Sequence, residues 1–349
     1  MVRKLLILFV VLLVVAGALA LMAVNEVNRR LETPHRGYAG SGVFVEVEAG
    51  DSTRVIASRL ADAGIVEDAL TFRLAVWKSG RDRDLQTGEY RFDEPLSPME
   101  VVEVIARGRV FLRSITFPEG LTIEEMAGVF DASPFGDRDA FVTAAHRVEL
   151  IADLDPDAAD LEGYLFPETY ALPREATAND LVEAMVEQFR RTFTSELRDA
   201  ARQDGMTVRE AVTLASLIEK ETGSVDEHRL VSAVYTNRLR IGMPLQCDPT
   251  VIYGLQLDGL YDGNLTRENL RYDSPYNTYV YGGLPPGPIA APGRAALEAV
   301  FAPADVSHLY FVSRNDGTHE FADTLREHNR NVQRYQVEYF RRRRQAASP

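Results

Sequence analysis

An uninterrupted apolar run near the N-terminus constrains this chain more than any other feature. Arg3 and Lys4 precede residues 5–24, which are all apolar. A helix rises about 1.5 Å per residue, so this run is long enough to cross the hydrocarbon layer of a bilayer. It is either a retained anchor or a cleaved secretory signal, since Ala18-Leu19-Ala20 resembles a cleavage site. In both cases we expect the remainder to be exported and soluble.

Composition narrows the class of the exported part. The chain has 349 residues, of which 46% are hydrophobic, enough for about two folded units. Its formal net charge of −14 argues against nucleic acid as a partner. A single cysteine, Cys247, excludes an intramolecular disulfide framework and a cysteine-rich metal site.

Residues 25–113 predict a linker followed by a small α+β module. The polar, glycine-containing stretch 25–42 is typical of a linker. Alternating apolar residues predict strands, and turn or cap residues separate them from helical patterns. The expected order over 43–113 is strand, two helices, strand and helix, at about 43–48, 53–63, 68–79, 87–92 and from 98 onward.

Residues 114–340 predict a larger, mainly helical domain, so the fold class is α+β overall. A strand at 110–118 leads to a capping box formed by Thr122 and Glu125. Helices are expected at about 138–145, 178–203, 207–222, 227–241, 292–301 and 324–340, with a strand at 308–313. Between them, 243–293 is rich in Tyr, Asn, Pro and Gly and predicts a long loop region. The basic tail 341–349 either complements the end of its helix or contacts an anionic glycan or lipid.

A carboxylate lies inside the apolar stripe of the helix expected at 207–222. At about 100° per residue, Glu219 falls among the apolar positions, with Ser216 and Lys220 on the opposite side. Burying a carboxylate is costly unless it is paired or protonated. Glu219 is therefore either a structural ion-pair partner or a proton donor at neutral pH, the group that glycosidic cleavage requires. The apolar positions are Val208, Ala211, Val212, Leu214, Ala215, Ile218 and Thr222.

The loop region supplies side chains suited to carbohydrate. Sugar sites combine aromatic faces with amide, hydroxyl and carboxyl groups. Gln246, Asp248, Tyr276 and Asn277 are candidates for binding, although a tyrosine-rich loop can equally pack against helices. A second acidic and aromatic cluster at 161–170 adds Glu162 and Glu168.

Several common chemistries lack their motifs. The chain has no phosphate-binding loop, no dinucleotide fingerprint and no Gly-x-Ser-x-Gly nucleophile elbow. His308, His319 and His328 do not have zinc-site spacing. We therefore expect neither a metal nor a cofactor.

Ordered motifs along the chain resemble the YceG-like family of endolytic murein transglycosylases. They are EGYLFPETY at 162–170, LASLIEKET at 214–222, NRLRIGM at 237–243, LQCDPTVIYG at 245–254, SPYNTY at 274–279, GLPPG at 283–287, IAAPG at 289–293 and LYFV at 309–312. The resemblance covers nearly the whole chain and makes 43–113 a LysM-like subdomain. Cys247 departs from the pattern, which has Thr or Ser there.

This resemblance implies the reaction and the place of action. The family's catalytic acid falls on Glu219, which would protonate the leaving oxygen between N-acetylmuramic acid and N-acetylglucosamine. The same residue would then take the proton of the muramic acid 6-hydroxyl, so that a 1,6-anhydro end forms without water. Implied partners are peptidoglycan strands and peptidoglycan synthases. The implied location is the bacterial inner membrane, with a single pass and the soluble part in the periplasm.

Two other functions fit the same substrate. A non-catalytic peptidoglycan-binding scaffold would need the LysM-like module but not Glu219. An ordinary muramidase would pair Glu219 with a second carboxylate, either Glu162, Glu168, Glu221 or Asp248.

Overall fold

The computed structural model describes residues 2–346 and contains both helices and strands, as the fold class predicts. About half of the chain is helical. The chain divides into two compact units. Unit 1 comprises Met1–Arg113 with Ala171–Glu175, and unit 2 comprises Ser114–Tyr170 with Ala176–Pro349.

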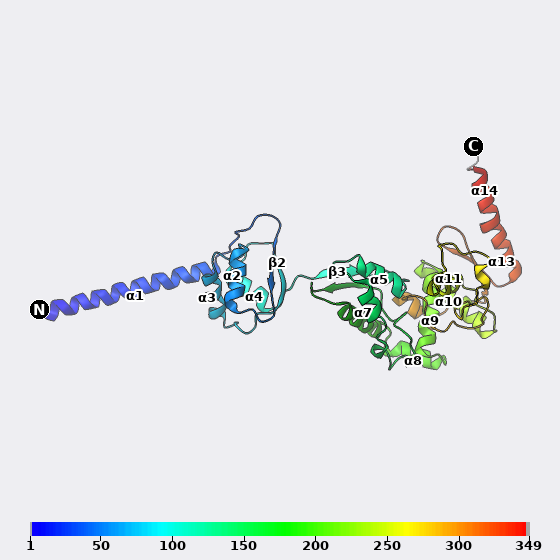
Figure 1. The fold of residues 1–349 in the computed structure, drawn as a ribbon, viewed down its shortest axis with the longest axis horizontal. Coiled ribbons are helices and arrows are strands. Elements are labelled where there is room, and N and C mark those ends of the chain that lie inside the picture. The colour runs from blue at the N-terminus through cyan, green and yellow to red at the C-terminus, as the bar shows by residue number, and fades with distance from the viewer. Residues whose placement is uncertain (1, 347–349) are drawn as a thin grey trace. The chain divides into compact units, whose positions relative to one another are not determined.

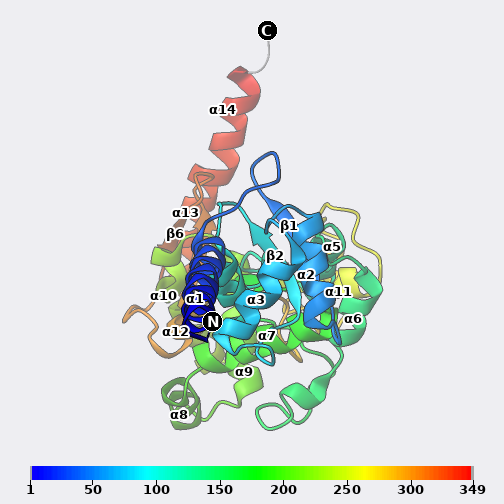
Figure 2. The same ribbon diagram turned by 90° about the vertical axis from the view of Figure 1, so that its left-hand side faces the viewer.

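A single long helix, α1 (Val2–Glu32), begins unit 1 (Figure 1). Its segment Ile7–Glu32 is long and apolar enough to cross a membrane. The helix continues eight residues beyond 24, into the stretch where a linker was expected. This expectation was wrong for residues 25–32 because the last turns of α1 pack against the unit, beside α3 and α4 (Figure 2). Leu31 is only 2% exposed there, and Lys78 Nζ donates to Asn28 Oδ1 at 2.9 Å.

The rest of unit 1 places three helices against a strand pair. The elements are β1 (Val43–Val47), α2 (Thr53–Asp62), α3 (Ala69–Ser79), β2 (Gly88–Phe92) and α4 (Pro98–Ala106). The strands are antiparallel, with Val43 opposite Phe92 and Val47 opposite Gly88. Ser52, Asp68 and Ser97 accept hydrogen bonds from the first turns of the three helices, which explains where each helix starts. Apolar residues from both strands and all three helices fill one core.

Unit 2 is mainly helical. Its first elements are β3 (Arg113–Thr116), α5 (Ile123–Asp131), α6 (Arg138–Ala144), the 3₁₀ turn η1 (Val148–Leu150), β4 (Thr169–Leu172), α7 (Ala178–Thr192) and α8 (Ser195–Gln203). Next come α9 (Val208–Glu221), α10 (Val225–Arg240), α11 (Asp248–Leu257), η2 (Asn269–Arg271) and α12 (Arg294–Phe301). The last are β5 (Tyr310–Ser313), β6 (His319–Ala322), α13 (Leu325–Val332), the π-helical η3 (Gln333–Glu338) and α14 (Tyr339–Ala346). Two-stranded sheets join β3 to β4 and β5 to β6.

Helix α9 lies at the centre of unit 2 and packs against α8, α10, α11 and α12. Its residues 211–218 are all buried, including Ser216, which the helical wheel had placed on a polar side. The wheel was wrong about that side because other segments of the unit cover it. Only the two ends of α9 reach solvent.

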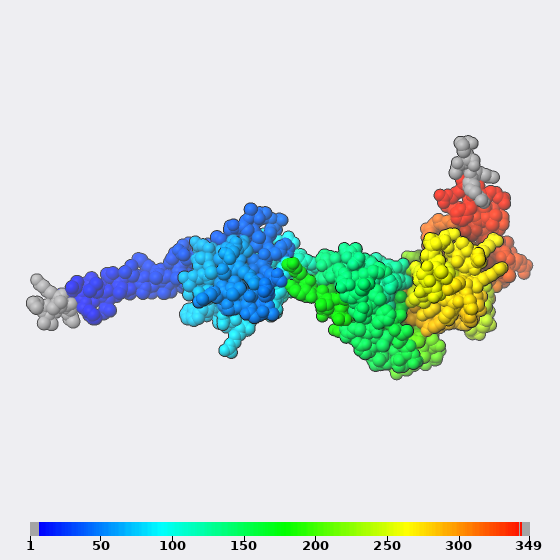
Figure 3. All heavy atoms as spheres, viewed as in Figure 1, coloured from blue at the N-terminus to red at the C-terminus, as the bar shows by residue number. Residues whose placement is uncertain are grey.

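Three further features differ from the sequence prediction. The helix expected over 178–203 breaks into α7 and α8, since Phe193 leaves helical geometry and is buried in a stack on Phe189. The loop region contains α11, and β4 and β6 were not anticipated. The loop residues around 250–275, yellow in Figure 3, form a continuous part of the surface of unit 2.

Candidate active site

Glu219 lies in the last turn of α9 and is partly buried. Its Oε2 accepts a hydrogen bond from the backbone N–H of Gly293 at 2.9 Å. Among the described residues, no donor contacts the other oxygen, Oε1. Burial, with a smaller effect of the nearby Glu119, raises the pKa of Glu219 to about 7, although the Gly293 N–H and Lys220 oppose the rise. The carboxyl is therefore near its midpoint at neutral pH, with one oxygen free for a ligand.

A short turn at 119–122 forms one wall beside Glu219. The N–H of Gly120 donates to the carbonyl of Ala291 at 2.8 Å, and the N–H of Ala291 donates to the carbonyl of Leu121, also at 2.8 Å. Lys220 Nζ donates to the carbonyl of Gly120 at 2.9 Å, which ties the turn to the end of α9. The Lys220 ammonium is therefore engaged with a backbone oxygen next to Glu219.

The buried Ser216 fixes the segment that carries Gly293. Its Oγ accepts from the N–H of Ile289 at 3.1 Å and donates to the carbonyl of Thr213 at 2.7 Å. Gly293 is the N-cap of α12, so the carboxyl of Glu219 sits at the positive end of that helix. The polar residues of α9 thus hold the donor that faces Glu219.

Glu162 is a second buried carboxyl, 6% exposed. It accepts from the N–H of Ile123 at 3.1 Å and from the hydroxyl of Tyr253 at 3.3 Å. Burial raises the pKa of Glu162 to about 8, so the neutral acid predominates at neutral pH. Tyr253 meets Tyr276 edge to face at 4.9 Å. The structure therefore brings Glu162 and Tyr276 together through Tyr253, and Glu162 and Tyr253 line a surface cleft at the start of α5.

Gln246 and Asp248 flank the start of α11, and both are exposed. Gln246 has a φ of 49°, and its N–H donates to the carbonyl of Thr278 at 3.2 Å. The Asp248 carboxyl accepts from the hydroxyl of Tyr279 at 2.6 Å. These contacts place the polar groups of Gln246 and Asp248 at the surface of the loop.

Asn277, expected to bind sugar, is fully buried instead. Its amide nitrogen donates to the carbonyls of Leu270 at 3.3 Å and Tyr272 at 2.8 Å, and its Oδ1 accepts from the N–H of Tyr279 at 2.9 Å. All these partners belong to the loop backbone. We therefore correct this assignment, because Asn277 holds the loop together and leaves nothing exposed for a ligand.

The remaining acidic candidates lie apart from Glu219. Glu168 is exposed, and its carboxyl accepts from the adjacent N–H of Thr169. Glu221 accepts from the hydroxyl of Tyr235 at 2.8 Å and from Cys247 Sγ at 3.5 Å, and burial raises its pKa. Neither carboxyl contacts Glu219 in the described part of the chain.

Sequence reasoning missed Glu119 and Gly293. Glu119 opens the turn at 119–122, and Gly293 ends the IAAPG motif, so both stood beside features that had been noticed. Nothing in the spacing of 119, 219 and 293 indicates that they meet. Glu119, Glu219 and Gly293 come together because two backbone hydrogen bonds join Ala291 to the turn at 119–122.

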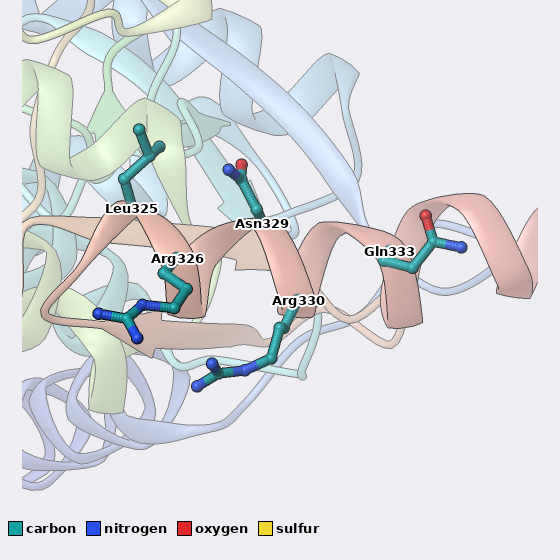
Figure 4. Close-up of a pocket in the computed structure, with 5 residues that line it drawn as sticks. All are labelled: Leu325, Arg326, Asn329, Arg330 and Gln333. Carbon is teal, nitrogen blue, oxygen red and sulfur yellow. The ribbon is translucent and has the colours of Figure 1, made fainter.

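In the described part of unit 2, neither a metal-binding cluster nor the concavity along α13 and η3 involves the predicted residues. Among the described residues, no group of three or more His, Cys, Asp and Glu side chains could hold a metal ion. A shallow concavity along α13 and η3 holds none of the predicted residues, and all its lining residues come from one exposed helical stretch (Figure 4). They are Leu325, Arg326, Asn329, Arg330 and Gln333.

Comparison with known proteins identifies the family to which the chain belongs. The model of the YceG-like family matches residues 45–334. The chain belongs to the YceG-like family. An endolytic murein transglycosylase of Bacillus subtilis is 31% identical over 322 residues, covering 84% of each chain. Another, from Streptococcus pneumoniae, is 28% identical, covering 83% of this chain and 58% of its own length. A crystal structure of a putative YceG-like protein from Listeria monocytogenes aligns with a TM-score of 0.57 at 29% identity, covering 84% of this chain and 99% of that one.

Proposed function

We propose that this YceG-like chain is an endolytic murein transglycosylase with Glu219 as its single acid–base. The relatives that cover most of the chain carry that name. The observation that carries the assignment to Glu219 is its carboxyl, which has a pKa of about 7 and one oxygen that no donor of residues 2–346 contacts. Such a group gives up and retakes a proton with little cost at neutral pH.

The proposed reaction uses Glu219 twice. Protonated Glu219 first donates to the oxygen between N-acetylmuramic acid and N-acetylglucosamine, and the bond from that oxygen to the anomeric carbon breaks. The resulting carboxylate accepts the proton of the muramic acid 6-hydroxyl, whose oxygen bonds to the anomeric carbon as a 1,6-anhydro ring. The Gly293 N–H, which donates to Oε2, stabilises the carboxylate between the two steps.

Exposed groups of the loop are the proposed contacts for the glycan. Half-buried Tyr276 offers part of an aromatic face, and exposed Gln246 and Asp248 offer polar groups at the surface. Glu162 is mostly neutral and supports this region through Tyr253. Its place in the cleft at the start of α5 suits a hydrogen bond from its acid proton to a sugar oxygen. Exposed Glu168 remains a proposed contact on motif position alone.

We place the enzyme at the outer face of the bacterial inner membrane, with α1 as its retained single-pass anchor and the rest in the periplasm. The apolar α1 supports the anchor. The strand–helix–helix–strand order of β1, α2, α3 and β2 supports a LysM-like peptidoglycan-binding role for residues 43–113. An anchored enzyme in this position meets nascent strands beside the peptidoglycan synthases, its proposed partners.

The test is digestion of purified sacculi by the full-length protein in detergent. Glu219→Gln keeps the shape and the acceptor for the Gly293 N–H but cannot transfer a proton. We expect release of muropeptides to fall by ~10²–10⁴-fold. Glu187→Gln, which makes the same charge change at an exposed position of α7, is the matched control and should digest normally. Undiminished release by Glu219→Gln would refute the assignment.

A further inference from the structure

Gly293 is contacted by two carboxyls. Its N–H donates to Glu219, and the carboxyl of Glu119 occupies the space where a side chain at position 293 would begin. A Cβ built there would overlap the Glu119 carboxyl. The backbone of Gly293 has a φ of −75°, which any residue adopts. Conformational freedom therefore does not require glycine at this position, whereas the position of Glu119 does.

Glu119 is held in this place through the backbone of its own turn. Gly120, the next residue, is bonded to Ala291 through its N–H and to Lys220 through its carbonyl. A Cβ at Gly120 would lie 3.7 Å from Glu219 Cγ. The turn thus lies beside Glu219, and the exposed carboxyl of Glu119 stands over the same glycine that binds Glu219.

We infer that Glu119 is a functional carboxyl of this site, a positioning residue that acts on Glu219 through its charge. As a carboxylate it disfavours the ionised form of Glu219, so that the proton stays on Glu219 until the glycosidic oxygen takes it. This inference rests on the proposed function, because it assigns the residue that readies the proposed acid. It differs from a two-carboxylate mechanism in that Glu119 transfers no proton.

The charges around Glu219 are few, so the effect of Glu119 is separable. On its own helix, Lys220 opposes Glu119 but is bonded to the Gly120 carbonyl. Glu221 points away, to Tyr235 and Cys247. From α12, Arg294 lies 3.8 Å from Glu298 and is paired with it. Like-charge proximity raises the pKa of a carboxyl, and Glu119 is the source of that effect on Glu219.

The first test is the pH profile of sacculus digestion by full-length Glu119→Gln. Removing the negative charge makes Glu219 ionise more easily, so the fall in activity on the alkaline side should begin at a lower pH than in wild type. We expect near-normal activity at pH 5.5 and a several-fold loss at pH 8, because more of Glu219 is then ionised in the variant than in wild type. Glu187→Gln should keep the wild-type profile. An unchanged profile in Glu119→Gln would overturn the inference.

The second test moves Glu119 without altering it. Gly293→Ala should displace the flexible Glu119 side chain and reproduce the alkaline loss, whereas adding it to Glu119→Ala should cost little more, because the space is then empty. Losses that multiply in the double variant would overturn the inference. Thermal unfolding of each variant at pH 5.5 distinguishes a loss of the Glu119 charge effect from a general loss of structure. The proposed function fails separately, if Glu219→Gln remains active or if the wild type releases reducing ends.

Discussion

Glu219 combines features that a surface glutamate lacks. It is partly buried, faces a like charge and retains one free oxygen, and these features keep its pKa near 7 even though the Gly293 N–H stabilises the carboxylate. Glu162 is more deeply buried and has a pKa of about 8. Its two donors, the Ile123 N–H and the Tyr253 hydroxyl, both bond to the same oxygen, Oε2. Within unit 2 the carboxyl of Glu219 is more accessible than that of Glu162, and this difference favours Glu219 for proton transfer.

Glu219→Gln should make the protein more stable at alkaline pH. Folding raises the pKa of Glu219 from 4.5 to about 7. Its contribution to stability is therefore fully present below pH 4.5 and is lost as the pH rises through 7. Glutamine stays neutral and loses nothing. We expect equal unfolding midpoints near pH 4 and an advantage of about 1–3 kcal/mol for the variant at pH 8.5, at roughly 1.4 kcal/mol per pKa unit and less for partial exposure. Denaturant titrations at both pH values measure it, and a variant less stable at pH 8.5 would contradict it.

The sequence singled out the carboxyl of Glu219 but not its surroundings. The period of a helix is local, so a wheel finds Glu219 among apolar residues without tertiary information. Glu119 and Gly293 are about 100 and 74 positions away from Glu219 in the chain, and only the fold brings them together. Asn277 shows the opposite error, since an amide suited to sugar is equally suited to holding a loop.

Helix α9 is the element on which the candidate site depends. Its Ser216 binds the segment that leads to Gly293, and its Val212 packs where the chain turns at Gly163. Gly163 has a φ of 81°, and a Cβ there would lie 2.5 Å from Pro288 Cβ. Any side chain at 163 therefore pushes on the segment that carries the Glu219 donor.

Gly163→Ala should destabilise unit 2 more than an ordinary glycine substitution does. A left-handed backbone costs alanine about 1–2 kcal/mol, and overpacking adds about 1–3 kcal/mol. Gly205→Ala is the matched control, since Gly205 has a φ of 71° but no atom within 4 Å of its would-be Cβ. Thermal unfolding should therefore rank wild type above Gly205→Ala, and Gly205→Ala above Gly163→Ala. Equal losses in the two variants would contradict the role of the Pro288 contact.

Elements with strong local signals could be predicted. Thr122 and Glu125 form the expected capping box, as do Thr207 and Glu210 at the start of α9. The break at Phe193 and the strand β6 could not be predicted, because the first depends on a buried aromatic stack and the second on pairing with β5. Local propensity carries no information about such partners.

In the whole molecule, the membrane-length helix α1 is also part of a folded unit. The last turns of α1 belong to the core of unit 1 through Leu31. The sequence indicated a membrane-length run correctly, but polar residues after 24 suggested a linker where the helix continues. A polar helical surface and a linker have the same composition, so only packing separates them. The expected domain boundaries at 113 and 340 remain predictions.

A soluble fragment starting at residue 25 should be more stable than one starting at 41. The longer fragment retains Leu31 and the bond from Lys78 to Asn28, whereas the shorter one loses both. Fully burying a leucine contributes about 1.5–3 kcal/mol. Thermal unfolding of unit 1 in the two fragments measures the difference. Identical unfolding midpoints would show that the last turns of α1 contribute nothing to the stability of unit 1.

The most direct test of the central claim is the mass of the muropeptides that the full-length protein releases from sacculi. If Glu219 alone provides acid and base, every new end should be a 1,6-anhydro end, with no water added, and Glu219→Gln should release ~10²–10⁴-fold fewer of them. Reducing ends, heavier by one water, would contradict the account. They would make the protein a hydrolase, with Glu119 beside Glu219 as the first candidate for a second catalytic carboxylate.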